Sequence, residues 1–259
     1  MRKELFITAL LIFVTTGAFS QTAAGTLKWD QTARQMIVVK TSGWENVAGT
    51  VQRFERKTVE TQWKAVGAPI AVVVGRGGLA WGRGLHPTNS AGPQKVEGDG
   101  KSPAGVFALS SAFGFASAEE MKWLKLPYLH VTDALECVDD VKSIRYNSIV
   151  DNSHVLNPDW NSSEKMREIG EQYRLGVVVN HNVAPRIAGK GSCIFLHIWK
   201  GDGSGTAGCT AMERGDLEEL VRWLDTESSP ILVQLPDSEF QRFEKDWRLP
   251  KPDAASRSQ

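Results

Sequence analysis

Two side chains that could act as a nucleophile and its base lie 12 positions apart in the last quarter of the sequence. His197 lies within the apolar run 193–199, which is typical of a buried strand. Cys209 follows a loop with four glycines, and a glycine-rich turn lets the backbone approach a substrate closely. The segment predicts a thiol aimed at an imidazole, which is the arrangement of a cysteine nucleophile.

The chemistry of this pair depends on the pKa of the thiol. A free cysteine has a pKa of about 8.5, and an adjacent imidazole or the start of a helix lowers it. Cys209 precedes a helix predicted after Met212, so we expect a thiolate there. His197 would hold the thiol proton and return it to a leaving amine. Its ring would be oriented by a backbone carbonyl near residues 204–205. The alternative is a core histidine and a buried cysteine that never meet.

The two other cysteines, Cys137 and Cys193, leave two alternatives open. A disulfide between them would leave Cys209 as a free thiol, because exported proteins usually pair their cysteines. The other alternative is three buried, reduced thiols. For Cys193, which lies inside an apolar run, simple burial is the favoured state.

The first 20 residues have the pattern of a secretory signal peptide. A basic start is followed by an apolar run over residues 5–19 and by small residues suited to cleavage before Gln21. The alternative is an uncleaved N-terminal anchor. We therefore expect a periplasmic or otherwise extracytoplasmic protein, without stable membrane association once the signal is cleaved.

Length and charge bound the rest of the chain. The 259 residues suit one domain, which we place at residues 25–247, followed by a disordered tail at 248–259. Lys and Arg together number 30, as do Asp and Glu, and loss of the signal leaves one acidic residue in excess. This balance does not indicate binding to nucleic acid or to an anionic membrane surface.

Short apolar runs separated by glycine, proline and aspartate turns outnumber the helical patterns. They predict a mostly β sandwich or barrel-like core with two or three helices. The expected strands cover residues 35–40, 49–54, 63–64, 68–75, 106–109, 128–132, 175–180, 193–199 and 231–235. Helices are expected at 118–124, at 163–173, after Met212 and, shorter, before Trp247.

Three blocks of sequence together resemble the L,D-transpeptidase (YkuD) family. The Phe-Leu-His-Ile-Trp stretch at 195–199 and Thr-Ala-Gly-Cys-Thr-Ala-Met at 206–212 resemble its active-site motif. Residues 97–107 resemble its Gly-Asp-x-Lys-Thr-Pro-x-Gly segment, and residues 137–151 resemble a block found in one branch. The resemblance covers most of residues 70–235. The chain differs at Ala207 and Ala211, where many members carry His and Arg or Asn.

The resemblance implies an exported cysteine acyl-transferase that remodels peptidoglycan by L,D-transpeptidation of stem peptides through a Cys209 thioester. It implies no metal and no organic cofactor. Backbone N–H groups around Gly208 and Thr210 would stabilise the oxyanion. The alternatives are a hydrolase on the same site, an L,D-carboxypeptidase or amidase, and a non-catalytic module that binds the cell wall. Oligomeric state is not predicted.

Further side chains could contact the substrate. Thr206 lies in the glycine loop, Arg145 could hold a substrate carboxylate, Tyr146 follows it, and His181 could line the cleft or lie on the surface. Of the other histidines, His86 and His154 are expected to be solvated and His130 half-buried; their spacing does not suit zinc. Asp99 and Lys101 form either an ion pair or, as we favour, an ordinary turn.

Overall fold

β-Branched apolar runs form the main sheet of this computed structural model, which describes residues 27–89 and 91–251. The central strands β1 (Gln35–Thr41) and β13 (Ile231–Pro236) are parallel and almost entirely buried. The other strands of this sheet are β2 (Ala48–Glu55), β3 (Lys64–Val73), β4 (Leu79–Trp81), β5 (Ser102–Gly114), β6 (Tyr128–His130), β10 (Leu175–Val179), β11 (Phe195–Ile198) and β12 (Thr210–Met212).

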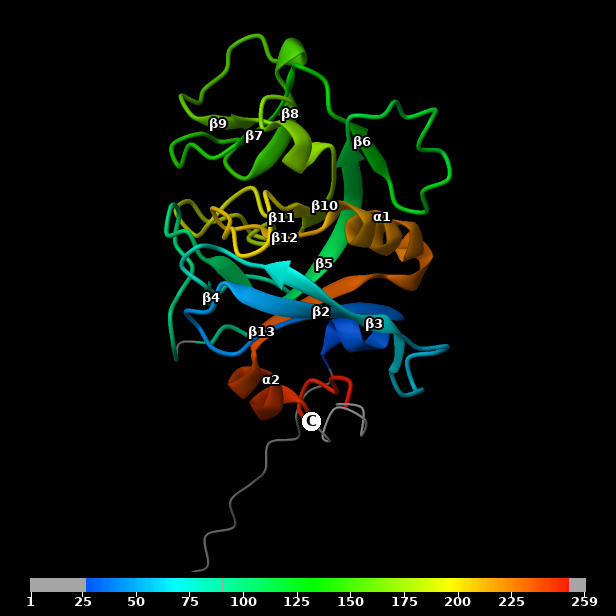
Figure 1. The fold of residues 1–259 in the computed structure, drawn as a ribbon. Helices are drawn as coiled ribbons and strands as arrows, with labels where there is room; N and C mark the ends of the chain where they lie inside the picture. The colour runs from blue at the N-terminus through cyan, green and yellow to red at the C-terminus, as the bar shows by residue number, and fades with distance from the viewer. Residues whose placement is uncertain (1–26, 90, 252–259) are drawn as a thin grey trace, which may run out of the picture.

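The sheet closes on itself. β5 pairs with β13 and also with β10, so the order β10-β11-β12-β3-β2-β1-β13-β5 returns to its start (Figure 1). Strands β4 and β6 attach to the two ends of the long β5. Closure removes free edges from eight of the strands and confirms the barrel-like, mostly β prediction. The separate expectations at 63–64 and 68–75 are one strand, β3.

Two α-helices cover the barrel. The helix predicted after Met212 is α1 (Arg214–Trp223), and it buries Leu217, Leu220 and Val221 against the core as their spacing requires. The short helix α2 (Asp237–Phe243) lies at the end of the molecule where the C-terminal segment emerges (Figure 1). Four single 3₁₀ turns complete the helical elements: η1 (Lys28–Gln31), η2 (Asn152–His154), η3 (Gly170–Tyr173) and η4 (Thr226–Ser228).

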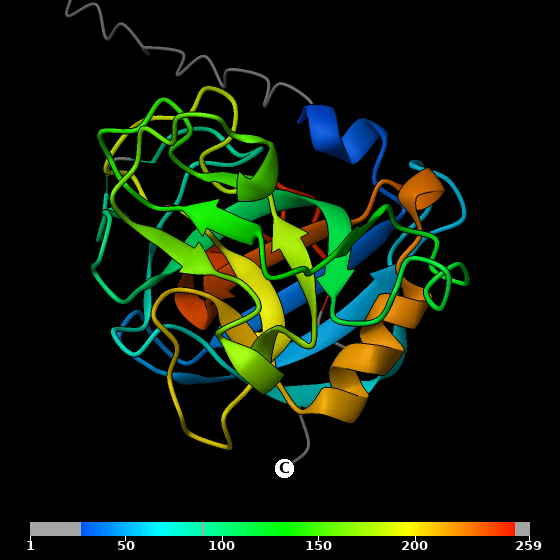
Figure 2. The same cartoon turned by 90° about the horizontal axis from the view of Figure 1, so that it is seen from above.

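A second, smaller sheet lies at the end of the molecule opposite α2 (Figures 1 and 2). Its order is β8-β7-β9, formed by β8 (Ser148–Asp151), β7 (Leu135–Val138) and β9 (Ser163–Lys165). The helix predicted over 163–173 is therefore wrong. Residues 163–165 pair with β7, and Gly170 adopts a positive φ of 78°, so only the 3₁₀ turn η3 remains helical.

Two further expectations differ from the structure. Residues 118–123 form consecutive turns rather than a helix, since only Met121 makes an i to i−4 bond there and the N–H groups of Lys122 and Leu124 bond three residues back. The tail predicted from 248 begins too early, since Leu249 is buried and Arg248 bonds the buried Asp30 at 3.0 Å. The predicted signal at 1–20 and residues 252–259 lie outside the described residues.

Candidate active site

Neighbouring parallel strands bring the predicted nucleophile and base together. In the register of β11 and β12, His197 is opposite Ala211. Side chains alternate along a strand, so Cys209, two residues before Ala211, faces the same side as His197. Both side chains line one cavity of about 440 Å³. The topology thus excludes an arrangement in which the two face opposite sides of the sheet.

The thiol of Cys209 lies against the backbone at the start of β11. Its Sγ accepts the N–H of Phe195 at 3.3 Å and donates to the carbonyl of Cys193 at 3.4 Å. The residue is only 6% exposed. Burial raises the pKa of the thiol to about 12, and the nearby Glu164 carboxylate acts in the same direction. The resting side chain of Cys209 is therefore a neutral thiol.

This result corrects the expected thiolate, and the structure gives the reason. A strand, β12, follows Cys209, and α1 begins only at Arg214, so no helix N-terminus faces the sulfur. The imidazole of His197 cannot supply a positive charge either. It is 4% exposed, and burial lowers its pKa to about 4.

The His197 ring is held in one tautomer. Its Nδ1 lies 2.8 Å from the carbonyl oxygen of Ile198, and because a carbonyl only accepts, Nδ1 carries the proton. Nε2 is then the basic nitrogen. The orienting group is a backbone carbonyl, as expected, but it belongs to the next residue rather than to the turn at 204–205. The ring of Tyr173 packs edge-on against the imidazole, with centroids 5.4 Å apart.

The comparison with protein families agrees with this geometry. The model of the L,D-transpeptidase catalytic domain (YkuD) matches residues 46–233, which include the barrel strands from β2 to β12, the first half of β13, and both His197 and Cys209.

The chain belongs to this family.

No curated protein and no solved structure matches. Membership in the L,D-transpeptidase family implies a function of that type on peptidoglycan and favours an extracytoplasmic place of action. No helix within residues 27–89 and 91–251 is long and apolar enough to cross a membrane. Among the same residues, no three His, Cys, Asp or Glu side chains converge as metal ligands would.

Hydroxyl groups fix the L,D-transpeptidase glycine loop against the nucleophile. Thr206 donates to the carbonyl of Cys209 at 2.5 Å and accepts the N–H of Gly208 at 3.1 Å. Ser102, fully buried on β5, donates to the same carbonyl at 2.7 Å and accepts the N–H of Gly75 at 2.8 Å. Thr206 is therefore a positioning group. The sequence reasoning missed Ser102, although it lies within the segment 97–107 that carries the resemblance.

Of the groups predicted to stabilise the oxyanion, some already have hydrogen-bond acceptors and some do not. The N–H of Gly208 is taken by Thr206, and the hydroxyl of Thr210 turns away from the cavity to bond Gln234 at 2.6 Å. The N–H of Cys209 has no acceptor among the described residues. It is therefore the donor best placed for a developing oxyanion.

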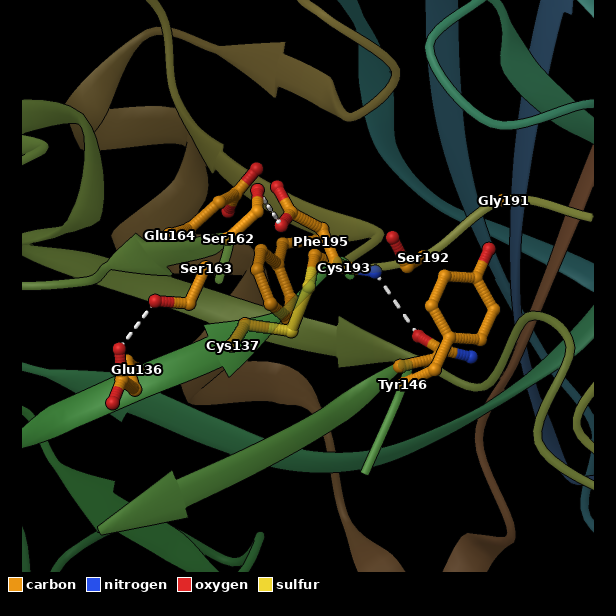
Figure 3. The surroundings of a disulfide bond; sticks show 12 residues. Glu136, Cys137, Tyr146, Ser162, Ser163, Glu164, Gly191, Ser192, Cys193 and Phe195 are labelled. Atoms are coloured by element: carbon orange, nitrogen blue, oxygen red, sulfur yellow. Dashed lines mark hydrogen bonds between the residues drawn. A yellow bond between two sulfur atoms is a disulfide. The ribbon is translucent and has the colours of Figure 1, made fainter. Parts of the chain in front are cut away.

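A disulfide joins the small sheet to the strand that carries the site (Figure 3). Cys137 on β7 is bonded to Cys193, with the Cα atoms 6.0 Å apart. The first of the two cysteine alternatives is thus confirmed, and simple burial of Cys193 is wrong. The backbone of Cys193 is held in place by its N–H, which donates to Asn147 Oδ1 at 3.0 Å. The carbonyl that accepts the thiol proton is consequently anchored to both sheets.

The remaining predicted contacts lie away from the thiol. Arg145 is exposed and lines a separate cavity of about 580 Å³ between the small sheet and the barrel. Tyr146 is buried and donates its hydroxyl to Glu97. His181 is buried, accepts the N–H of Arg83 at 3.2 Å and donates to the carbonyl of Lys190 at 2.8 Å, so both ring nitrogens are engaged. None of the three lines the cavity of Cys209.

The other histidines and the Asp99 turn also have defined places. His86 is buried rather than solvated, because its ring fills the space beside Gly105 that a Cβ would occupy. His154 is exposed as expected, and His130 is exposed rather than half-buried. Asp99 accepts the backbone N–H of Lys101 at 2.9 Å and pairs with Lys95, which supports the turn and excludes the Asp99–Lys101 pair.

Charged side chains of both signs line the cavity itself. Arg76, Lys95 and Lys200 supply positive charge, and Glu97, Asp139 and Glu164 supply negative charge. Trp199, Tyr173 and the glycine loop complete the wall. Such a cavity suits a polar ligand that carries both ammonium and carboxylate groups. The sequence does not identify Glu164 and Tyr173 as cavity residues, because it predicts a helix over 163–173.

Proposed function

We propose that the protein is an exported L,D-transpeptidase in which Cys209 is the nucleophile and His197 is the general base. The observation that carries the proposal is the shared cavity, in which a neutral thiol lies with a neutral imidazole whose Nδ1 is already bonded. A basic Nε2 at a pKa of about 4 is a weak base at rest. Its proton transfer must therefore accompany attack on the substrate rather than precede it.

Acylation would join the substrate to the sulfur of Cys209 and release the terminal D-alanine. The Sγ of Cys209 forms a bond to the carbonyl carbon after the third stem residue, and its proton passes to Nε2 of His197. The carbonyl oxygen becomes an oxyanion that the Cys209 N–H stabilises. The C–N bond to the terminal D-alanine then breaks, and the imidazolium returns the proton to the departing amine.

The second half of the reaction transfers the acyl group. An amine of a neighbouring stem attacks the thioester, loses a proton to His197, and releases the thiol as the new amide forms. Water in place of that amine would make the protein an L,D-carboxypeptidase or amidase. Among the lining side chains, the guanidinium of Arg76 is suited to a substrate carboxylate. The residue is held beside the glycine loop by its backbone N–H, which donates to the carbonyl of Thr206 at 2.8 Å.

The test is covalent labelling of the intact protein. A carbapenem should add its mass to the wild type, and Cys209→Ala should remove the adduct while the disulfide is retained. Cys209→Ser is the matched variant and should label far more slowly. An unlabelled wild type would favour the non-catalytic binding module. Tetrapeptide muropeptides then separate the enzymes, because cross-linked dimers indicate transfer and tripeptides alone indicate hydrolysis.

A further inference from the structure

The carboxylate of Glu164 is placed at the cavity by the small sheet. On β9, Glu164 is the register partner of Cys137, whose sulfur is bonded to Cys193 (Figure 3). Its side chain lines the cavity of the nucleophile, and its Oε2 accepts the hydroxyl of Tyr173 at 2.6 Å. Among the charges acting on it, none from the described residues is positive. A carboxylate held in this way beside a nucleophile is not a structural ion pair.

Tyr173, whose hydroxyl bonds this carboxylate, packs in the same buried cluster as Cys209. Tyr173 is 3% exposed, and its ring is fixed edge-on against Phe195, with centroids 5.5 Å apart, and against His197. Tyr173 and Cys209 also line the same cavity, and Cys209 raises the pKa of Tyr173 whereas Tyr173 lowers the pKa of Cys209. A tyrosine carries one hydroxyl proton, so it donates to the carboxylate or to the sulfur but not strongly to both.

We propose that Glu164 is a positioning residue for the reaction, which sets through the Tyr173 hydroxyl whether the sulfur of Cys209 is stabilised as a thiolate. A protonated Glu164 donates to the Tyr173 oxygen and frees the phenolic proton for the sulfur. An ionised Glu164 holds that proton for itself and adds a negative charge close to the developing thiolate. Only a solvent proton is exchanged. The inference rests on the proposed role of Cys209 as nucleophile.

The groups around Glu164 place this change in the neutral range. Burial raises the pKa of Glu164 to about 7; the Tyr173 hydroxyl opposes this, and Asp139 and Glu97 add to it. Lys95, whose positive charge lowers the pKa of Cys209, is already paired with Asp99 at 2.5 Å. The imidazole of His197 has a pKa of about 4 and does not titrate in the same range.

The experiment measures the rate constant of carbapenem acylation between pH 5.5 and 8.5. In the wild type we expect a fall of about tenfold as the pH rises through 7, the size of one hydrogen bond to a charged group. Glu164→Gln, which cannot ionise, should be flat over this range and faster than the wild type at pH 8. Tyr173→Phe should be slower at low pH and should also lose the step.

Asp139→Asn is the matched control, because Asp139 lines the same cavity but bonds Ser162 rather than Tyr173. It should retain the step, moved slightly to lower pH, because Asp139 raises the pKa of Glu164 and removing that like charge makes Glu164 easier to ionise. A Glu164→Gln variant that labels and keeps the wild-type step would overturn the inference alone. A wild type that never labels would instead overturn the proposed function.

Discussion

The barrel and the small sheet are stabilised in different ways. In the barrel, β1 and β13 present rows of fully buried residues, and Met36, Ile37 and Leu232 belong to one continuous core. In the small sheet, no residue of β8 or β9 is buried. Its own apolar contacts are few, and they centre on Cys137 and Met166. A three-stranded sheet with so little core is marginal by itself.

Polar and covalent contacts replace that missing core. The buried Glu136 accepts hydrogen bonds from Ser163 and Lys165 on the neighbouring strand, and the disulfide joins β7 to Cys193. Cys209 and His197 belong to the barrel, whereas Glu164 belongs to the small sheet. The difference shows that the strand register of the barrel positions the thiol and the imidazole, while a separately anchored sheet adds the carboxylate of Glu164 to their cavity.

The largest effect should come from the barrel side of the site. His197→Gln removes the base while the amide can still bond the backbone, and acylation should slow by about 10³-fold, or roughly 4 kcal/mol of barrier. Single-turnover mass spectrometry measures this rate. The exposed His154→Gln is the control and should react as the wild type does. An unchanged rate in His197→Gln would remove the general base.

An intermediate effect should separate the two sheets. The pair Cys137→Ala and Cys193→Ala removes the link that closes a loop of 56 residues, and should cost about 2–4 kcal/mol of unfolding free energy. Hydrogen exchange should accelerate first in residues 135–165, while the amides of β1 and β13 stay protected. Uniform loss of protection across both sheets would mean that they unfold as one unit.

The smallest effect compares one methyl group in each region. Ile37→Val in the fully buried β1 should cost about 1 kcal/mol, because a cavity is left in packed surroundings. The same change at the half-buried Ile149 of β8 should cost only a few tenths of this amount. Chemical denaturation measures both. Equal losses would contradict the view that the small sheet lacks a packed core.

Much of the barrel could be predicted from the sequence, because strands such as β1 and β13 are apolar, β-branched runs whose pattern indicates a buried strand without knowledge of their partners. The helix α1 was predicted for the same reason, from the spacing of Leu217, Leu220 and Val221. The segment 163–173 failed because its structure is decided by distant partners: Glu164 pairs with Cys137, and Gly170 interrupts a helix that propensity alone would allow.

The site shows the same division. Cys209 and His197 were recognised from residue type and order, and the carbonyl that orients the ring was expected in kind. The predicted thiolate is wrong, since the ionisation of Cys209 depends on burial by Tyr173, Phe195 and the loop, which no local pattern encodes. His86 was misjudged likewise, because its pocket exists only where Gly105 lacks a side chain.

The covered, protonated state of Cys209 has a consequence for the covalent integrity of the chain. Only a thiolate attacks a disulfide, and a pKa of about 12 leaves about one sulfur in 10⁵ ionised at pH 7. Cys193 forms the disulfide with Cys137, and its carbonyl oxygen lies 3.4 Å from the sulfur of Cys209. The protonated state of the thiol thus protects the neighbouring disulfide from exchange with Cys209.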